Sequence, residues 1–169
     1  MKSMAGLGAA ALLISLTASP VISDTATLDR YVEMLRSDLK ADKTAILTEA
    51  LQLSDAEGKA FWPIYREYEV ELSAWGDQRY SILKQYAKAY NADVVSDDLA
   101  DDLAKHFMTL QKQRQTLMQK YYKKFAKEVS PMRAAQFLQA EHQIGLLVDL
   151  SIASEVPFLE KGKAVASDK

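Results

Sequence analysis

Residues 53–72, LSDAEGKAFWPIYREYEVEL, decide the fold because they combine a helix start with a residue that disrupts helices. Ser54 and Glu57 have the spacing of a capping box, in which each side chain accepts a hydrogen bond from the other residue's backbone N–H. Pro63 lies nine residues after Ser54, too deep to be the first residue of that helix. It leaves the Lys59 carbonyl without its usual backbone donor. The stretch therefore predicts either one bent helix or two helices that meet near Pro63.

The apolar spacing favours one bent helix. Three aromatic residues keep a helical period across Pro63, and the apolar positions then continue at steps of three and four residues. These positions are Phe61, Tyr65, Tyr68, Leu72, Trp75, Ile82 and Tyr86. We predict a single helix from Ser54 to about Tyr90, bent in the segment GKAFWP so that an aromatic face can wrap a partner.

Three further segments have the apolar period of helices. The first covers residues 27–52, with an expected break at Ala41-Asp42. Ser96 is placed to cap the second, and Ser130-Pro131 opens the third, where a proline at the first helical position loses no hydrogen bond. Pro157 ends it. The predicted buried positions are Leu28, Tyr31, Leu35, Leu39, Ile46, Leu47 and Leu51; Leu99, Leu103, Phe107, Leu110, Leu117, Tyr121 and Phe125; and Phe137, Leu138, Ile144, Leu147, Val148 and Ile152.

Strand signals are nearly absent, so the predicted fold class is all-α. Helices of about 35 residues would be roughly 50 Å long at 1.5 Å per residue, too long for a compact globule of this size. We therefore predict an elongated protein of four to five helices, built on a long antiparallel helical hairpin with a bend near Pro63.

Residues 1–23 have the regions of a secretory signal peptide. Their apolar run of about 12 residues is shorter than the roughly 20 that a membrane-spanning helix needs. Cleavage is expected near Ser23, with Ala18 as the alternative. We therefore predict an exported, periplasmic chain with a single helical domain at residues 24–159. Residues 160–169 lack an apolar pattern and are predicted to be a disordered tail.

Composition excludes several classes of function. The chain has no cysteine, and therefore no disulfide, thiolate metal site, covalently attached haem or lipid-modified cysteine. No stable membrane anchor is expected after signal cleavage. Residues 24–169 contain 20 basic and 23 acidic side chains, and this mild acidity disfavours a dedicated nucleic-acid-binding protein.

Catalytic and metal-binding motifs are also scarce. Neither His106 nor His142 has a glutamate three residues before it, as a di-iron helical bundle requires, and no nucleophile or phosphate-binding motif is present. We expect no enzymatic activity and no cofactor. Asp102 and His106, one helical turn apart, are weak candidates for a shared metal ion; the simpler interpretation is an exposed hydrogen-bonded pair.

Charge is unevenly distributed along the segment that Ser96 opens. Acidic residues crowd its start, and its second half is basic, with Lys112, Arg114, Lys120, Lys123, Lys124 and Lys127. One interpretation is a surface for an acidic or unfolded partner. The other is complementarity to the helix macrodipole, which is worth about 0.3–1 kcal/mol per charge in the terminal turns. Lys112 and Arg114 lie too far from the helix end to interact strongly with the dipole.

Three charged residues interrupt apolar stripes: Arg79, Arg114 and Glu141. A buried charge without a partner destabilises a protein by several kcal/mol. We therefore predict that these residues form one ion-pair cluster that fixes the register of the helices.

Two aromatic residues, Trp62 and Tyr80, lie off the apolar stripe of their helix. They either pack against the preceding helix or belong to an exposed binding surface, and packing is the simpler interpretation.

The sequence LSDAE, which includes Leu53, Ser54 and Glu57, resembles the Leu-Thr-x-x-Gln motif of the Spy/CpxP-like family of bacterial periplasmic helical proteins. Serine replaces the threonine and glutamate replaces the glutamine. A poorer second match is VSPMR, residues 129–133, where arginine stands at the glutamine position. The segments AFWPIY and RAAQFLQAEHQI add to the likeness, which covers roughly residues 45–157.

This resemblance implies a periplasmic helical protein, often a curved dimer, that acts as an ATP-independent chaperone or as a stress or metal sensor. Family chaperones tend to be basic on their concave face, whereas this chain is acidic. The metal-sensing members use histidine-rich groups that this sequence does not show. We expect a non-enzymatic protein that binds unfolded or partner polypeptides. The alternatives are a heavy-metal-responsive sensor and a structural helical bundle without a client.

Overall fold

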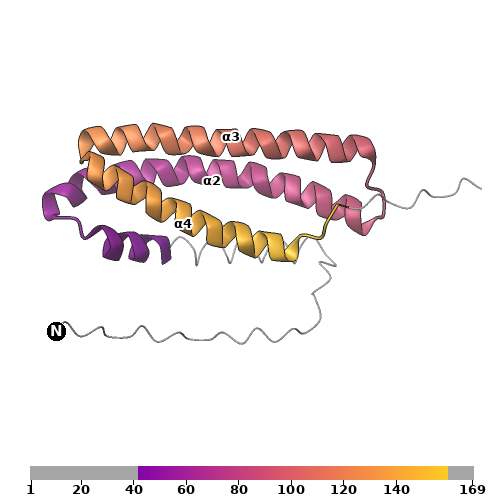
Figure 1. Ribbon diagram of the computed structural model, residues 1–169, viewed down its shortest axis with the longest axis horizontal. Helices are drawn as coiled ribbons and strands as arrows, with labels where there is room; N and C mark the ends of the chain where they lie inside the picture. The colour runs from indigo at the N-terminus through magenta and orange to yellow at the C-terminus, as the bar shows by residue number, and fades with distance from the viewer. Residues whose placement is uncertain (1–41, 160–169) are drawn as a thin grey trace, which may run out of the picture.

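The computed structural model describes residues 42–159 (Figure 1). The predicted signal peptide with its cleavage site, the part of the first predicted helical segment before residue 42 and the predicted tail after residue 159 lie outside this range. Within it, helices account for most residues and no strand is present. The predicted all-α, elongated fold is therefore confirmed.

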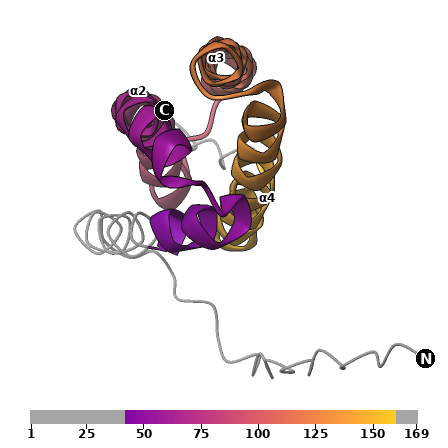
Figure 2. The ribbon, with the colours of Figure 1, turned by 90° about the vertical axis from the view of Figure 1, so that its left-hand side faces the viewer.

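Three long helices make up most of the described chain: α2 spans Asp55–Asn91, α3 spans Asp97–Glu128 and α4 spans Pro131–Glu155. Residues 42–51 are also helical, and we call them the N-terminal segment. Helices α2 and α3 form a hairpin, and α4 returns along α3. The N-terminal segment lies between α2 and α4 on the side away from α3 (Figure 2). None of these helices combines the length and hydropathy needed to cross a bilayer.

Each long helix begins after a serine, as the sequence predicts. In α2, the Ser54 hydroxyl accepts from the Glu57 N–H at 3.3 Å, and the Glu57 carboxylate accepts from the Ser54 N–H at 2.9 Å, which completes the capping box. The Ser96 and Ser130 hydroxyls each accept from the N–H three residues later at 3.2 Å. The starts of all three long helices are thus fixed by local hydrogen bonds that the sequence encodes.

Helix α2 runs through Pro63 without interruption, so the alternative of two helices is wrong. Pro63 is exposed, which places the unpaired Lys59 carbonyl on the side where water can satisfy it. The bend at this proline stays a prediction.

Two buried clusters lie at opposite ends of the molecule. The first lies at the end where Ser54 and Ser130 cap their helices, which we call the capped end. Its rings pack closely, with 4.4 Å between the centroids of Phe125 and Phe137 and 4.6 Å between those of Phe61 and Phe125. This aromatic cluster comprises Leu47, Leu51, Phe61, Ile64, Tyr65, Tyr68, Tyr121, Phe125, Ala134, Phe137 and Ala140.

The second cluster lies at the loop end, where α2 connects to α3. It is smaller and comprises Tyr86, Ala89, Val95 and Leu103. After α4 the chain crosses back to α2, where the Tyr86 hydroxyl donates to the Pro157 and Phe158 carbonyls at 3.2 and 3.0 Å. The termination of α4 before Pro157 is as predicted.

Three residues predicted to be buried are exposed instead: Ile46, Phe107 and Leu147. Figure 1 shows α4 separating from α3 toward the loop end, so Phe107 on α3 loses the helix that would have covered it. On α4, Ile144 takes the buried position and its neighbour Leu147 faces solvent. This part of α4 is apolar on more than one face, and periodicity alone cannot select the buried one.

Candidate partner-binding surface

Three exposed leucines lie within five residues on the second half of α4. Leu146, Leu147 and Leu150 are 54%, 68% and 69% exposed, and we call them the α4 leucine strip. Phe107 and Met108 on α3 are also more than half exposed in the loop-end half of the molecule. Contiguous exposed apolar side chains on a soluble protein usually mark an interaction site.

Acids of α2 neutralise two residues of the predicted basic surface of α3. Lys120 Nζ lies 2.5 Å from Glu71 Oε1, and Lys124 pairs with Glu67 in the same way. Lys127 pairs with its neighbour Glu128 at 2.9 Å. Lys112 and Lys123 have no ion-pair partner within residues 42–159. Lys120 and Lys124 therefore form ion pairs that span the hairpin, and as exposed pairs these add little stability.

Two of these contacts shift pKa values. Hydrogen bonds from Lys120 and from the Tyr121 hydroxyl, the latter at 2.8 Å, hold the pKa of Glu71 below its usual value. Burial, together with this hydrogen bond to a carboxylate, raises the pKa of Tyr121. Both residues therefore keep their ordinary charge states near neutral pH.

The predicted cluster of Arg79, Arg114 and Glu141 does not form. Glu141 is 1% exposed, and its Oε1 lies 3.0 Å from the Nζ of Lys43, which is itself 3% exposed. The two arginines do not pair with Glu141, because they lie about one to two helical turns farther toward the loop end.

Lys43 is the cation at the centre of a buried polar group. Its Nζ also lies 2.6 Å from Glu69 Oε1, which accepts from the Tyr65 hydroxyl at 3.0 Å. The Tyr68 hydroxyl donates to Glu141 Oε2 at 2.7 Å. Burial, followed by the nearby Glu141 carboxylate, raises the pKa values of both tyrosines. Lys43 thereby fastens the N-terminal segment to α2 and α4 at once.

Both arginines lie over the ring of Trp75. Its Nε1–H donates to the Leu110 carbonyl of α3 at 2.9 Å. The Arg114 guanidinium lies 4.9 Å from the ring centroid and that of Arg79 lies 5.6 Å from it, both within cation–π range. Arg79 also forms an ion pair with Asp149 of α4 at 2.6 Å. Arg79 is therefore in an inter-helix ion pair as predicted, but with a different acid.

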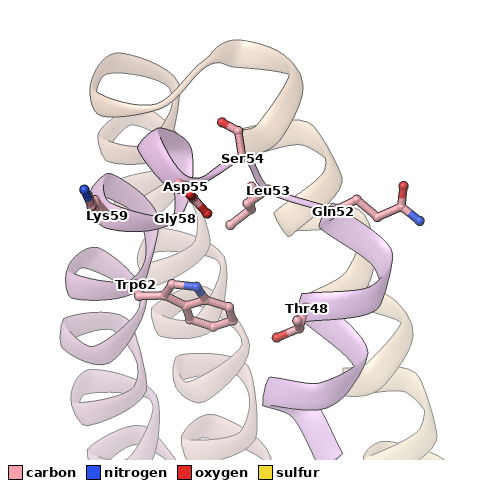
Figure 3. A pocket seen from close by; sticks show the side chains of 8 residues that line it. All are labelled: Thr48, Gln52, Leu53, Ser54, Asp55, Gly58, Lys59 and Trp62. Carbon is pink, nitrogen blue, oxygen red and sulfur yellow. The ribbon is translucent and has the colours of Figure 1, made fainter.

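Trp62 packs rather than projecting into solvent. Its ring makes edge contacts with Phe61 at 5.1 Å and with Tyr65 at 5.7 Å. It lines an open cleft of about 380 Å³ between the start of α2 and the N-terminal segment, where Figure 3 shows it beside Thr48. The other lining residues are Gln52, Leu53, Ser54, Asp55, Gly58 and Lys59.

Tyr80, the second off-stripe aromatic residue, is partly buried. Lys84 Nζ lies 5.9 Å from the centroid of its ring. It is not part of the cleft that Trp62 lines, so the structure does not bring these two residues together.

Asp102 and His106 adopt the simpler of the two predicted arrangements. His106 Nδ1 lies 2.8 Å from the Asp102 backbone carbonyl, one turn earlier on exposed α3. Within residues 42–159, no three His, Asp or Glu side chains gather closely enough to hold a metal ion.

The two capping motifs meet at the capped end. Arg133 donates from Nε to Glu57 Oε1 at 2.8 Å and from Nη2 to Glu57 Oε2 at 3.2 Å. Its Nη1 donates to the Leu51 carbonyl at 2.5 Å. The hydrogen bonds from Arg133, followed by those from Ser54, lower the pKa of Glu57 to about 2. The glutamate and arginine that replace glutamine in the two motif matches are therefore each other's partners, a bidentate pair that joins α2, α4 and the N-terminal segment.

Sequence reasoning missed Lys43 and the α4 leucine strip. Lys43 lies four and eight residues before Leu47 and Leu51, so extending that stripe one turn back would have marked a lysine at a buried position. The strip was hidden because Leu147 had been assigned to the core. The excess of apolar residues around the whole second half of α4 could have indicated that some of them must face solvent.

Comparison of the chain with protein-family models, with curated proteins and with solved structures gave no match. The likeness to the Spy/CpxP-like family therefore stays a prediction from the two short motifs.

Proposed function

We propose that this protein is an exported, periplasmic, non-enzymatic chaperone that holds unfolded polypeptides without ATP. The observation that carries the proposal is the α4 leucine strip, three leucines more than half exposed within five residues. Leucine contacts are non-directional, so a strip of this kind accepts many unfolded sequences that expose apolar side chains.

The surroundings of the strip also support this proposal. Two of the exposed lysines of α3, Lys120 and Lys124, pair with acids of α2, so less free positive charge remains to restrict the partner to acidic chains. The capped end carries the larger buried core, which leaves the second half of α4 free to expose apolar groups.

An aggregation assay with a chemically denatured client tests the proposal. We expect the chain to suppress light scattering at stoichiometric protein. The triple variant Leu146→Gln, Leu147→Gln, Leu150→Gln should lose most of this suppression, because it removes the apolar contact area but leaves the buried clusters intact.

The matched control removes three exposed apolar residues elsewhere, with Val70→Gln, Val94→Gln and Met132→Gln. It should suppress aggregation as the unaltered chain does. Equal loss in both triple variants would show that suppression depends on exposed apolar area in general and not on the α4 leucine strip. No suppression by the unaltered chain would refute the chaperone proposal and leave a structural bundle.

A further inference from the structure

The guanidinium of Arg114 has no acidic partner in the part of the chain that the structure describes. It occupies the inward-facing stripe of α3 and is partly buried. Within residues 42–159 its guanidinium has no hydrogen bond or ion pair, and its contact is the face of Trp75. A partly buried arginine without a carboxylate is unfavourable for stability, so a role other than stability is the better explanation of its position.

The chain makes room for this guanidinium on α4. A Cβ atom at Gly145 would lie 2.9 Å from Arg114 Nη2, closer than real Cβ contacts allow. With glycine at this position the guanidinium lies directly against the α4 backbone, and a Cβ there would make the flexible end of the arginine side chain shift. The Trp75 ring on its other side is oriented by the hydrogen bond to the Leu110 carbonyl. Arg114 is thus held between three helices with its hydrogen-bonding capacity unused.

The local charge balance favours an anion. Two guanidinium groups, those of Arg79 and Arg114, share the Trp75 ring, and a single carboxylate, Asp149, pairs with Arg79. Asp149 is half exposed, so this site is open to solvent. A planar guanidinium matches a carboxylate through two parallel hydrogen bonds, and tryptophan and arginine are the residues most enriched at binding hot spots.

We propose that Arg114, supported by Trp75 and Gly145, binds an aspartate or glutamate side chain of an unfolded polypeptide. Apolar contacts lie on either side of it: Leu146 directly follows Gly145, and Phe107 lies two helical turns from Arg114, about 10 Å along α3. The segment recognised is therefore an acidic residue flanked by apolar ones. This inference rests on the proposed chaperone function. It assigns the binding of acidic side chains to Arg114, where the sequence had pointed to the lysines of α3.

Fluorescence anisotropy with two labelled 12-residue peptides tests the inference. Both contain leucine and serine, and they differ only by aspartate or asparagine at the central position. We expect the aspartate peptide to bind about tenfold more tightly, in the range of a charged hydrogen bond. Arg114→Gln should abolish this preference. Arg114→Lys, which keeps the charge but not the planar fork, should retain part of it.

The control is Arg66→Gln, which removes the same charge from an exposed position on α2. It should leave the preference for aspartate unchanged. Melting temperatures of all variants check that they fold. In a Trp62→Phe background Trp75 is the single tryptophan, and its emission should change with the aspartate peptide and not with the asparagine peptide. That readout does not depend on the stability of Arg114→Gln.

Equal binding of the two peptides, or an equal loss in Arg66→Gln and Arg114→Gln, would overturn the assignment. If neither peptide binds while the chain still suppresses aggregation, the carboxylate site is wrong and the chaperone proposal stands. If the chain also fails to suppress aggregation, the proposed function fails first.

Discussion

The capped end and the loop end of the same three helices differ in how they use apolar residues. At the capped end six aromatic rings are buried together, and buried Lys43 and partly buried Arg133 join the N-terminal segment to the helices. At the loop end four residues form the buried cluster, and leucines of α4 face solvent nearby. The capped end can therefore supply most of the stability while the loop end keeps apolar surface exposed.

Long helices allow stability and exposed apolar surface to lie at different ends, because a helix that is packed at one end keeps its backbone hydrogen bonds along its length. Local stability varies within a native protein, and binding surfaces are commonly found in its less stable parts.

The largest effect is expected from Phe137→Ala. Phe137 is fully buried among Phe61, Tyr65, Tyr68 and Phe125, and its removal should lower the free energy of unfolding by about 3–5 kcal/mol. Leu103→Ala at the loop end should lower it by less. Urea denaturation measures both. Equal losses would show that the two clusters contribute alike.

The next largest effect is expected from Lys43→Met. It leaves the Glu141 carboxylate buried without its cation, a change worth about 3 kcal/mol. The double variant Lys43→Met, Glu141→Leu should recover part of the loss, because no buried charge then remains unpaired at Glu141. Lys59→Met at an exposed position of α2 serves as the control. A loss no larger than that of the control would show that the N-terminal segment is not held by this pair.

A smaller, pH-dependent effect is expected from Glu57→Gln. Its pKa falls from 4.5 to about 2 on folding, so the ionised form stabilises the folded state at pH values above 4.5. That contribution is lost as the pH falls toward about 2. Glutamine preserves the capping box and removes the charge facing Arg133. The stability difference between the unaltered chain and the variant should therefore shrink between pH 4.5 and 2.

Thermal denaturation at a series of pH values measures this difference. Glu49→Gln, at an exposed position of the N-terminal segment, is the matched control. A difference that stays constant down to pH 2 would mean that the Glu57–Arg133 pair does not contribute to stability.

The smallest effect on stability is expected from Leu147→Gln. Leu147 is mostly exposed, so the free energy of unfolding should change by less than about 0.5 kcal/mol. Ile144→Gln, one turn earlier and buried, should lower it several-fold more. Equal losses in urea denaturation would show that Leu147 belongs to the core, and the α4 leucine strip would then not be an exposed surface.

The sequence predicted local features better than the spatial ones. Ser54, Ser96 and Ser130 start their helices as expected, because caps depend on residues within one turn. The partners of Arg79 and Glu141 could not be predicted, since they depend on how far each helix is shifted along its neighbour. Lys43 was missed because a lysine near a segment start normally indicates solvent exposure. The exposure of Phe107 follows from the separation of α3 and α4, which no local pattern records.

Hydrogen–deuterium exchange with and without a denatured client tests the central claim most directly. If the α4 leucine strip binds unfolded chains, client addition should slow exchange in residues 143–153 and leave residues 55–68 at the capped end unchanged. Slower exchange around the cleft lined by Thr48 and Trp62, with none on α4, would contradict the account and place the binding surface at the capped end.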